Sequence, residues 1–168
     1  LQIDPLLGVY DDLIETFENV GYTRGEDFFV ANYDWRMTPG PRPNGDGEID
    51  GVVTGLTVNN LTDNEYDHGV DYLGYWLDQA EQAYKAAHGG AELPAVNIIA
   101  HSTGGLVSRS YIQSDLYNDP SNTLPKVHDF VMMGVPNRGA AGPWNPLQNN
   151  WNADIASRIV LSKLGANA

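Results

Sequence analysis

The stretch of sequence that most constrains the fold is VNIIAHSTGGLVSRSYI, residues 96–112. A run rich in β-branched residues comes first, then a histidine, Ser102, a threonine and two glycines, and then apolar side chains at helical spacing. A short run that is apolar throughout is typical of a strand buried on both faces of a parallel sheet. The stretch therefore predicts a strand over residues 95–100, a sharp turn at Ser102 and a helix over residues 104–116.

Patterns elsewhere extend this arrangement along the chain. Apolar residues recur at helical spacing over residues 9–20, 70–87 and 155–164, which predicts three further helices. Short apolar runs bounded by turn residues predict strands over residues 27–35 and 127–134. Strands that are apolar throughout and alternate with helices favour an α/β fold, with a mostly parallel sheet and helices on both faces.

Charge limits the partners of this chain. Its 168 residues include nine Lys and Arg against 22 Asp and Glu, a formal net charge of −13. Such a surface repels phosphate groups, so nucleic acids and anionic membrane surfaces are poor partners. A secreted location is compatible with this acidity, but the sequence does not fix the compartment, nor the oligomeric state. No apolar run approaches the ~18 residues that span a bilayer, so we expect no integral membrane segment.

We expect neither a metal nor a cofactor. The chain has no cysteine, which excludes disulfides, thiolate metal sites and a cysteine nucleophile. Residues 43–51, PNGDGEIDG, are similar to a calcium-binding loop in their middle positions. Arg42 and Val53, however, stand where such a loop has acidic ligands. We therefore expect a solvated, glycine-rich turn there.

Ser102 is the candidate nucleophile. A sharp strand-to-helix turn lifts its central residue out of the sheet, and it needs small residues two positions before and after, here Ala100 and Gly104. The backbone N–H of Thr103, at the start of the helix, can donate to an oxyanion. His101 is expected in the pocket wall or in packing, since adjacent side chains point apart. The alternative is a helix cap, with glycines for tight packing.

Four segments narrow the family. In order and spacing, YDDLIETFENVGY, YDWR, AHSTGGLVSR and GVPNRGA resemble the lecithin:cholesterol acyltransferase-like branch of the α/β-hydrolases, over roughly residues 8–141. Ala100 and Thr103 depart from the usual glycine and methionine of that branch. The resemblance implies a partial α/β-hydrolase fold. It also implies a serine enzyme that acts on lipid or other carboxylic esters through an acyl-enzyme on Ser102, with water or an alcohol as acceptor.

The resemblance also assigns a role to the YDWR segment. By similarity, Asp34, Trp35 and Arg36 are substrate-binding residues at the rim of the pocket. Their alternative role is structural, with an Asp34–Arg36 pair that locks a loop and a tryptophan that packs. Two other functions stay open for the whole chain. One is a catalytically inactive hydrolase-like binding module, and the other is an amidase or thioesterase on the same scaffold.

The catalytic partners of Ser102 are not evident in the sequence. In this fold an acid and then a histidine follow the serine along the chain. After Ser102 the only histidine is His128, at the entrance of the next strand, and beyond that strand the only acid is Asp154. We therefore expect the triad Asp and His outside this chain. On this interpretation residues 1–168 form one partial domain, with a lid or cap region at about 140–168 and little turnover alone.

Overall fold

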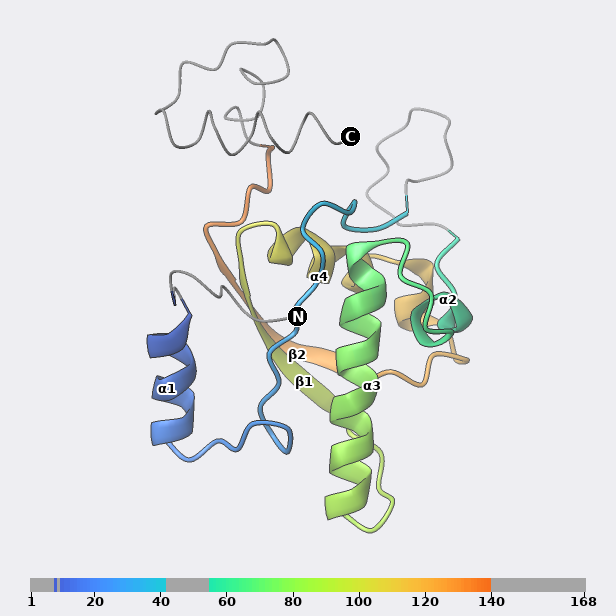
Figure 1. Ribbon diagram of the computed structural model, residues 1–168. Helices are drawn as coiled ribbons and strands as arrows, with labels where there is room; N and C mark the ends of the chain where they lie inside the picture. Colours follow the sequence, from blue (N-terminus) through green and yellow to red (C-terminus); the bar gives the residue numbers. More distant parts are fainter. Residues whose placement is uncertain (1–7, 9, 42–54, 140–168) are drawn as a thin grey trace, which may run out of the picture. The chain divides into compact units, whose positions relative to one another are not determined.

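The computed structural model describes residue 8 and residues 10–41 and 55–139 (Figure 1). The chain divides into two compact units, Leu1–Val135 and Pro136–Ala168, and every helix and strand of the described residues belongs to the first. Three predictions lie outside the described residues. They are the helix over 155–164, the lid region from about residue 140 and the turn over 43–51.

A two-stranded parallel sheet carries the site. Strand β1 covers Ala95–His101 and strand β2 covers Lys126–Met133, with Ile99 opposite Val131 in the register. Both strands and their parallel pairing were predicted, because apolar, β-branched runs favour such strands. The fold class, α/β with a parallel sheet, is confirmed.

Helices α3 and α4 lie on one side of the sheet (Figure 1). Helix α3 covers Gly69–Ala87, and the short helix α2, Val58–Thr62, packs against it. The carboxylate of Asp71 caps the N-terminus of α3, because it accepts hydrogen bonds from the backbone N–H groups of Asp67 and His68, at 2.8 and 2.7 Å. An acidic side chain in the first turn also suits the helix dipole. Helix α3 therefore begins one residue before its predicted start.

Helix α4 is shorter than predicted. It covers Gly104–Ile112, and a 3-10 helix, Asp115–Asn118, follows it. The hydroxyl oxygen of Ser114 accepts a hydrogen bond from the backbone N–H of Tyr117, which caps this second, separate turn. Serine competes with helix continuation in this way, because its side chain offers the backbone another acceptor. The apolar residues keep helical spacing up to Leu116, so the sequence pattern predicted one continuous helix.

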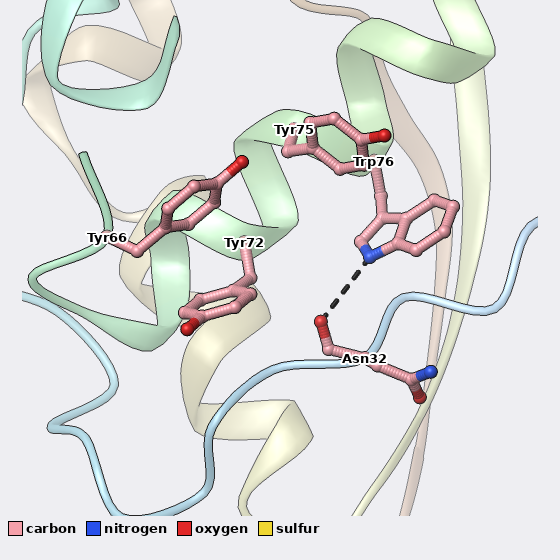
Figure 2. Close-up of a pocket in the computed structure, with 5 residues that line it drawn as sticks. All are labelled: Asn32, Tyr66, Tyr72, Tyr75 and Trp76. Atoms are coloured by element: carbon pink, nitrogen blue, oxygen red, sulfur yellow. Dashed lines mark hydrogen bonds between the residues drawn. The ribbon is translucent and has the colours of Figure 1, made fainter. Parts of the chain in front are cut away.

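The predicted strand over residues 27–35 is wrong. This segment forms no strand, and its backbone pairs with no other strand of the described residues. It runs beside α3 instead, where the indole Nε1 of Trp76 donates a hydrogen bond to the carbonyl oxygen of Asn32 at 3.3 Å (Figure 2). An apolar run becomes a strand only where a neighbouring backbone exchanges hydrogen bonds with it. The residue pattern does not reveal whether such a neighbour exists.

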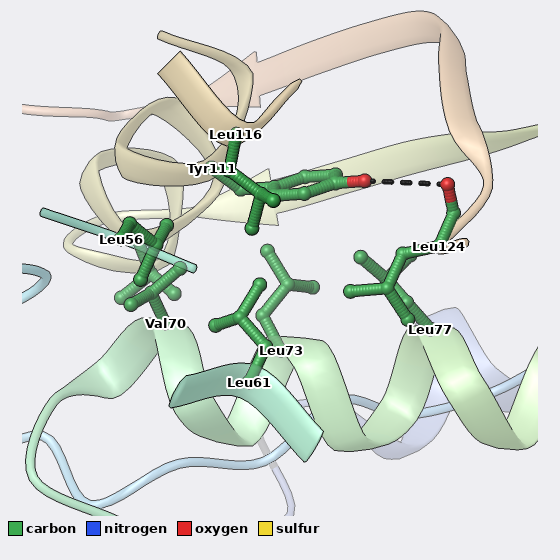
Figure 3. Packing of buried hydrophobic residues seen from close by; sticks show 9 residues of the cluster. Leu56, Leu61, Val70, Leu73, Leu77, Tyr111, Leu116 and Leu124 are labelled. Atoms are coloured by element: carbon green, nitrogen blue, oxygen red, sulfur yellow. Dashed lines mark hydrogen bonds between the residues drawn. The ribbon is translucent and has the colours of Figure 1, made fainter. Parts of the chain in front are cut away.

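The core lies between α2, α3, α4 and the loop that leads into β2 (Figure 3). Tyr111 and Val70 are fully buried in it. The other buried members are Leu56, Leu61, Leu73, Leu77, Val107, Leu116 and Leu124. The Tyr111 hydroxyl donates to the carbonyl oxygen of Pro125 at 3.3 Å and accepts from the side-chain amide of Asn122 at 3.1 Å. Burial raises the pKa of Tyr111 to about 12.

Helix α1, Asp11–Asn19, lies on the other side of the sheet from α3 (Figure 1). It begins two residues after the predicted start, and its N-terminus is tied to the end of β1 through Tyr10 and His101. The helix ends before Gly21, which has φ +108° and whose N–H donates to the carbonyl oxygen of Glu18. A glycine with positive φ is a common end of a helix.

Candidate active site

Ser102 stands on a strained turn between β1 and α4. Its φ is +53°, and Asn64 is the only other non-glycine residue with positive φ in the described ranges. A serine in this region is held there by its surroundings, since the conformation costs about 1 kcal/mol or more. The Ser102 N–H donates to the carbonyl oxygen of Met133 at 2.9 Å, and its carbonyl oxygen accepts from the N–H of Gly105 at 3.1 Å. The predicted sharp turn is therefore present, half-buried at the end of the sheet.

The glycine that this turn requires is Gly105. A Cβ on Gly105 would lie 2.7 Å from Cγ1 of Val135, closer than such atoms approach in proteins. A Cβ on Gly104 would meet only Cε1 of Tyr33, at 4.0 Å, which is an ordinary contact. The expectation placed the tight position at Gly104. The tight position is instead Gly105, one residue after Gly104, because helix α4 comes closest to Val135 there. Ala100, the small residue before the serine, is buried as expected.

Thr103 caps α4 and contacts a residue far away in the sequence. Its Oγ1 atom lies 2.5 Å from the hydroxyl oxygen of Tyr33. Tyr33 is partly buried against the core, and a Cβ on Gly69 would lie 3.2 Å from its ring. No acceptor among the described residues pairs with the backbone N–H of Thr103. This N–H is therefore open at a helix N-terminus, a place that favours a negative charge.

Sequence reasoning missed Tyr33, although it is the first residue of the YDWR segment. The residues singled out were the three that follow it. Asp34 accepts hydrogen bonds on both carboxylate oxygens from the Arg36 guanidinium, at 2.8 Å from Nε and 2.5 Å from Nη2. These bonds hold the pKa of Asp34 at about 2, well below its usual range. The pair closes a turn, as the structural alternative expected. Trp35 does not pack, since it is 64 % exposed.

His101 lies on the exposed face of the sheet. Its Nδ1 atom lies 2.6 Å from the hydroxyl oxygen of Tyr10, and the two rings meet edge to face with centroids 5.7 Å apart. The contact joins the start of α1 to the residue next to Ser102. His101 thus packs against a neighbouring ring, and its side chain points away from the α4 side of the sheet.

All four histidines of the chain lie within the described residues, and none forms a hydrogen bond with Ser102. Each Nδ1 atom has another partner: Asp71 for His68, the Tyr84 carbonyl for His88, Tyr10 for His101 and Asp129 for His128. His128 sits near the start of β2, and the site is at the end of that strand. None of these four rings is therefore paired with the Ser102 hydroxyl in this structure.

Within the described part of the chain, the side chains of His, Asp and Glu form no group of three that could hold a metal ion. None of the described helices combines the length and the apolar character that a membrane crossing requires.

Comparison with known proteins gives one match. The model of a family described as palmitoyl protein thioesterase matches residues 47–167, which include the Ser102 turn, both strands and helices α2, α3 and α4. Searches of curated proteins and of solved structures found no match. The α/β-hydrolase part of the resemblance is confirmed, whereas the lecithin:cholesterol acyltransferase-like branch stays a prediction. The chain belongs to the palmitoyl protein thioesterase family, an α/β-hydrolase family.

Proposed function

We propose that this protein hydrolyses long-chain acyl thioesters through an acyl-enzyme formed on Ser102. The observation that carries the proposal is Ser102 at φ +53° on a strand-to-helix turn, inside the region matched by the thioesterase family. A strained turn of this kind holds a serine hydroxyl in the position that acyl transfer requires. Thioester hydrolysis was among the alternatives that the sequence left open, and the family match favours it over transfer to an alcohol.

The reaction has two steps. In the first, Oγ of Ser102 attacks the acyl carbonyl carbon, its proton passes through a general base to the sulfur, and the carbon–sulfur bond breaks to release the thiol. In the second, water attacks the acyl-enzyme, one of its protons passes through the base to Oγ of Ser102, and the fatty acid is released. The N–H of Thr103 donates to the oxyanion in both steps. Removing one such donor from a serine hydrolase costs about 3–4 kcal/mol of transition-state stabilisation.

The base comes from a residue other than the four histidines of this chain. His101 and His128 are engaged by Tyr10 and Asp129, and neither is hydrogen-bonded to Ser102. A serine hydroxyl is a weak nucleophile without an adjacent base. We therefore propose that the triad histidine and acid belong to segments of the protein outside these 168 residues.

Trp35 is the proposed contact for the acyl chain. It is 64 % exposed, and it follows Tyr33 by two positions on a turn that Asp34 and Arg36 close. The contact between Tyr33, the residue before this turn, and Thr103 supports this role. An exposed indole offers apolar area to a lipid chain at low entropic cost. The acidic surface disfavours a free anionic lipid, so we expect an acyl group attached to a neutral or cationic carrier.

The test is labelling and turnover of the full-length protein. A fluorophosphonate probe should modify Ser102, located by peptide mass spectrometry. Ser102→Ala should reduce palmitoyl thioester hydrolysis by several orders of magnitude, as loss of a nucleophile does. Ser121→Ala is the control and should leave the rate unchanged, because Ser121 is exposed and bonds only Asp119. Near-normal turnover by Ser102→Ala, or labelling of another serine, would remove the proposal.

A further inference from the structure

A cavity of about 270 Å³ lies between helix α3 and the segment that contains Asn32 (Figure 2). Four of its five lining residues are aromatic: Tyr66, Tyr72, Tyr75 and Trp76. The volume is near the lower end of small-molecule sites, which begin at about 300 Å³. A pocket with this many rings and so little aliphatic surface is unlike the aliphatic core of the same protein (Figure 3).

The rings form two pairs. The centroids of Tyr66 and Tyr72 are 4.5 Å apart, and those of Tyr75 and Trp76 are 5.2 Å apart with the planes nearly perpendicular. The indole N–H of Trp76 already donates to the carbonyl oxygen of Asn32. Trp76 therefore offers a ligand its ring surface and no free donor. Aromatic ring faces carry negative charge density and attract cations.

Most of the charged residues near these rings in the sequence are acidic. No lysine or arginine occurs between residues 43 and 84, whereas acidic residues alternate with the rings in the run DNEYDHGVDYLGYW. A second cavity, of about 210 Å³, has four acidic side chains in its lining: Asp63, Glu65, Asp67 and Asp71. Glu65 and Asp67 are the chain neighbours of Tyr66, so the acidic cavity flanks the aromatic one.

The pKa of Tyr66 is also affected by the negative charge near this cavity. Burial raises the pKa of Tyr66, and Tyr75, Tyr72 and the carboxylate of Asp71 raise it further. The positively charged Arg36 interacts electrostatically with Tyr72, one of the rings of the cavity. Its guanidinium also forms an ion pair with the carboxylate of Asp34. The surroundings of the cavity therefore favour a cation over an anion.

We propose that this aromatic cavity binds a quaternary ammonium group, either of a small cation such as choline or of a choline lipid headgroup. Such a group is bulky, weakly hydrated and without a hydrogen-bond donor. It therefore suits a pocket of ring faces better than a lysine ammonium or a metal ion does. Aromatic pockets that enclose methylated ammonium groups by cation–π attraction are a known use of this chemistry. The site is separate from Ser102, and its occupation does not depend on catalysis.

The first test compares charge at constant shape. Calorimetric titration of the folded, full-length protein with choline should give saturable binding. The neutral carbon isostere 3,3-dimethyl-1-butanol should bind at least tenfold more weakly, because it has the same shape without the charge. Equal affinity of the two compounds would overturn the proposal, and so would an absence of choline binding. Titration with phosphocholine distinguishes the two sources of the quaternary ammonium group. Phosphocholine that binds as tightly as choline or more tightly indicates a lipid headgroup, whereas phosphocholine that binds more weakly indicates a free cation.

Variants locate the binding. Trp76→Leu should weaken choline binding at least tenfold, and Trp76→Phe should keep part of it because a ring face remains. Tyr84→Leu is the matched control: Tyr84 lies on the same helix but stacks on His88, with centroids 3.9 Å apart, and its loss should leave choline affinity unchanged. Circular dichroism checks that each variant is folded. Unchanged choline affinity in folded Trp76→Leu would contradict the assignment of this cavity, whatever the outcome at Ser102.

Discussion

The hydroxyl group of Tyr33 lies 2.5 Å from Oγ1 of Thr103, although 70 positions separate the two residues in the sequence. The contact ties the segment before the Asp34–Arg36 turn to the N-terminus of α4. It holds the side chain of the residue whose backbone N–H is the proposed oxyanion donor. We therefore propose that Tyr33 is a positioning residue, which acts through Thr103.

Tyr33→Phe should lower kcat for thioester hydrolysis about fivefold and leave KM nearly unchanged. The variant keeps the ring against the core and removes only the hydrogen bond, which is worth about 1 kcal/mol. Steady-state kinetics of the full-length enzyme measure this. Tyr22→Phe serves as the control, because Tyr22 is exposed and lies beside Phe17 at the end of α1.

A double-mutant cycle separates positioning from general destabilisation. Thr103→Val should lower kcat to a similar extent, and the double variant should lose no more than either single one, because both remove the same bond. Thr103→Ser keeps the hydroxyl and should retain activity. Independent, additive losses would show that Tyr33 does not act through Thr103.

Gly105→Ala should destabilise the protein by about 1–3 kcal/mol, the usual effect of forcing a methyl group into a packed contact. Its Cβ would press on Val135, whose branched side chain has little rotational freedom. Gly104→Ala is the matched control and should be near neutral. Urea unfolding measures both, and equal stability of the two variants would contradict the asymmetry between the neighbouring glycines.

Tyr111→Phe should lower the free energy of unfolding at pH 7 by about 1–2 kcal/mol, because it leaves buried hydrogen-bonding groups unpaired. The pKa of Tyr111 is raised from 10.0 to about 12 in the folded state. Its contribution is therefore complete below pH 10 and is lost as the pH rises towards 12, by about 2–3 kcal/mol. The stability gap between wild type and Tyr111→Phe should therefore close over this range and change sign near pH 12. A gap that stays constant from pH 9 to 12 would show that Tyr111 does not carry this linkage.

The Asp34 carboxyl should titrate at about pH 2 in carbon-detected NMR. Arg36→Gln removes the guanidinium hydrogen bonds, the largest cause of this low pKa, and keeps the backbone N–H bond, so the titration should move part of the way towards the ordinary value of 3.8. Since the folded pKa is the lower one, the pair stabilises the turn above about pH 4 and loses this effect as the pH falls to 2. Asp119 is the internal control, because its pKa is lowered by Ser121 and should not respond.

Residues 1–168 alone should hydrolyse a palmitoyl thioester no faster than their own Ser102→Ala variant. The reason is that none of the four histidines forms a hydrogen bond with Ser102, and a serine hydroxyl without an adjacent base is a weak nucleophile. The assay compares the two purified chains at equal concentration. A rate that depends on Ser102 in this chain would place a base within it and would overturn the proposal of an external histidine.

Local pattern was sufficient for the elements around the site. The apolar run before Ser102 and the helical spacing after it predicted β1, the turn and the start of α4, because side-chain periodicity depends on the geometry of each element. The same argument predicted α3, β2 and their place in an α/β fold. Local pattern also marked Ser102 and Thr103, since a strand-to-helix turn with small flanking residues is visible in the chain itself.

The tertiary structure alone decided which distant groups meet. The apolar run over 27–35 has the composition of a strand, but strand formation depends on a partner backbone, which no local pattern records. The tight glycine is Gly105 because Val135 returns to that point after β2, and Tyr33 gains its role because the fold brings it to Thr103. Periodicity is a property of neighbours in the sequence, whereas steric contact and hydrogen bonding depend on neighbours in space.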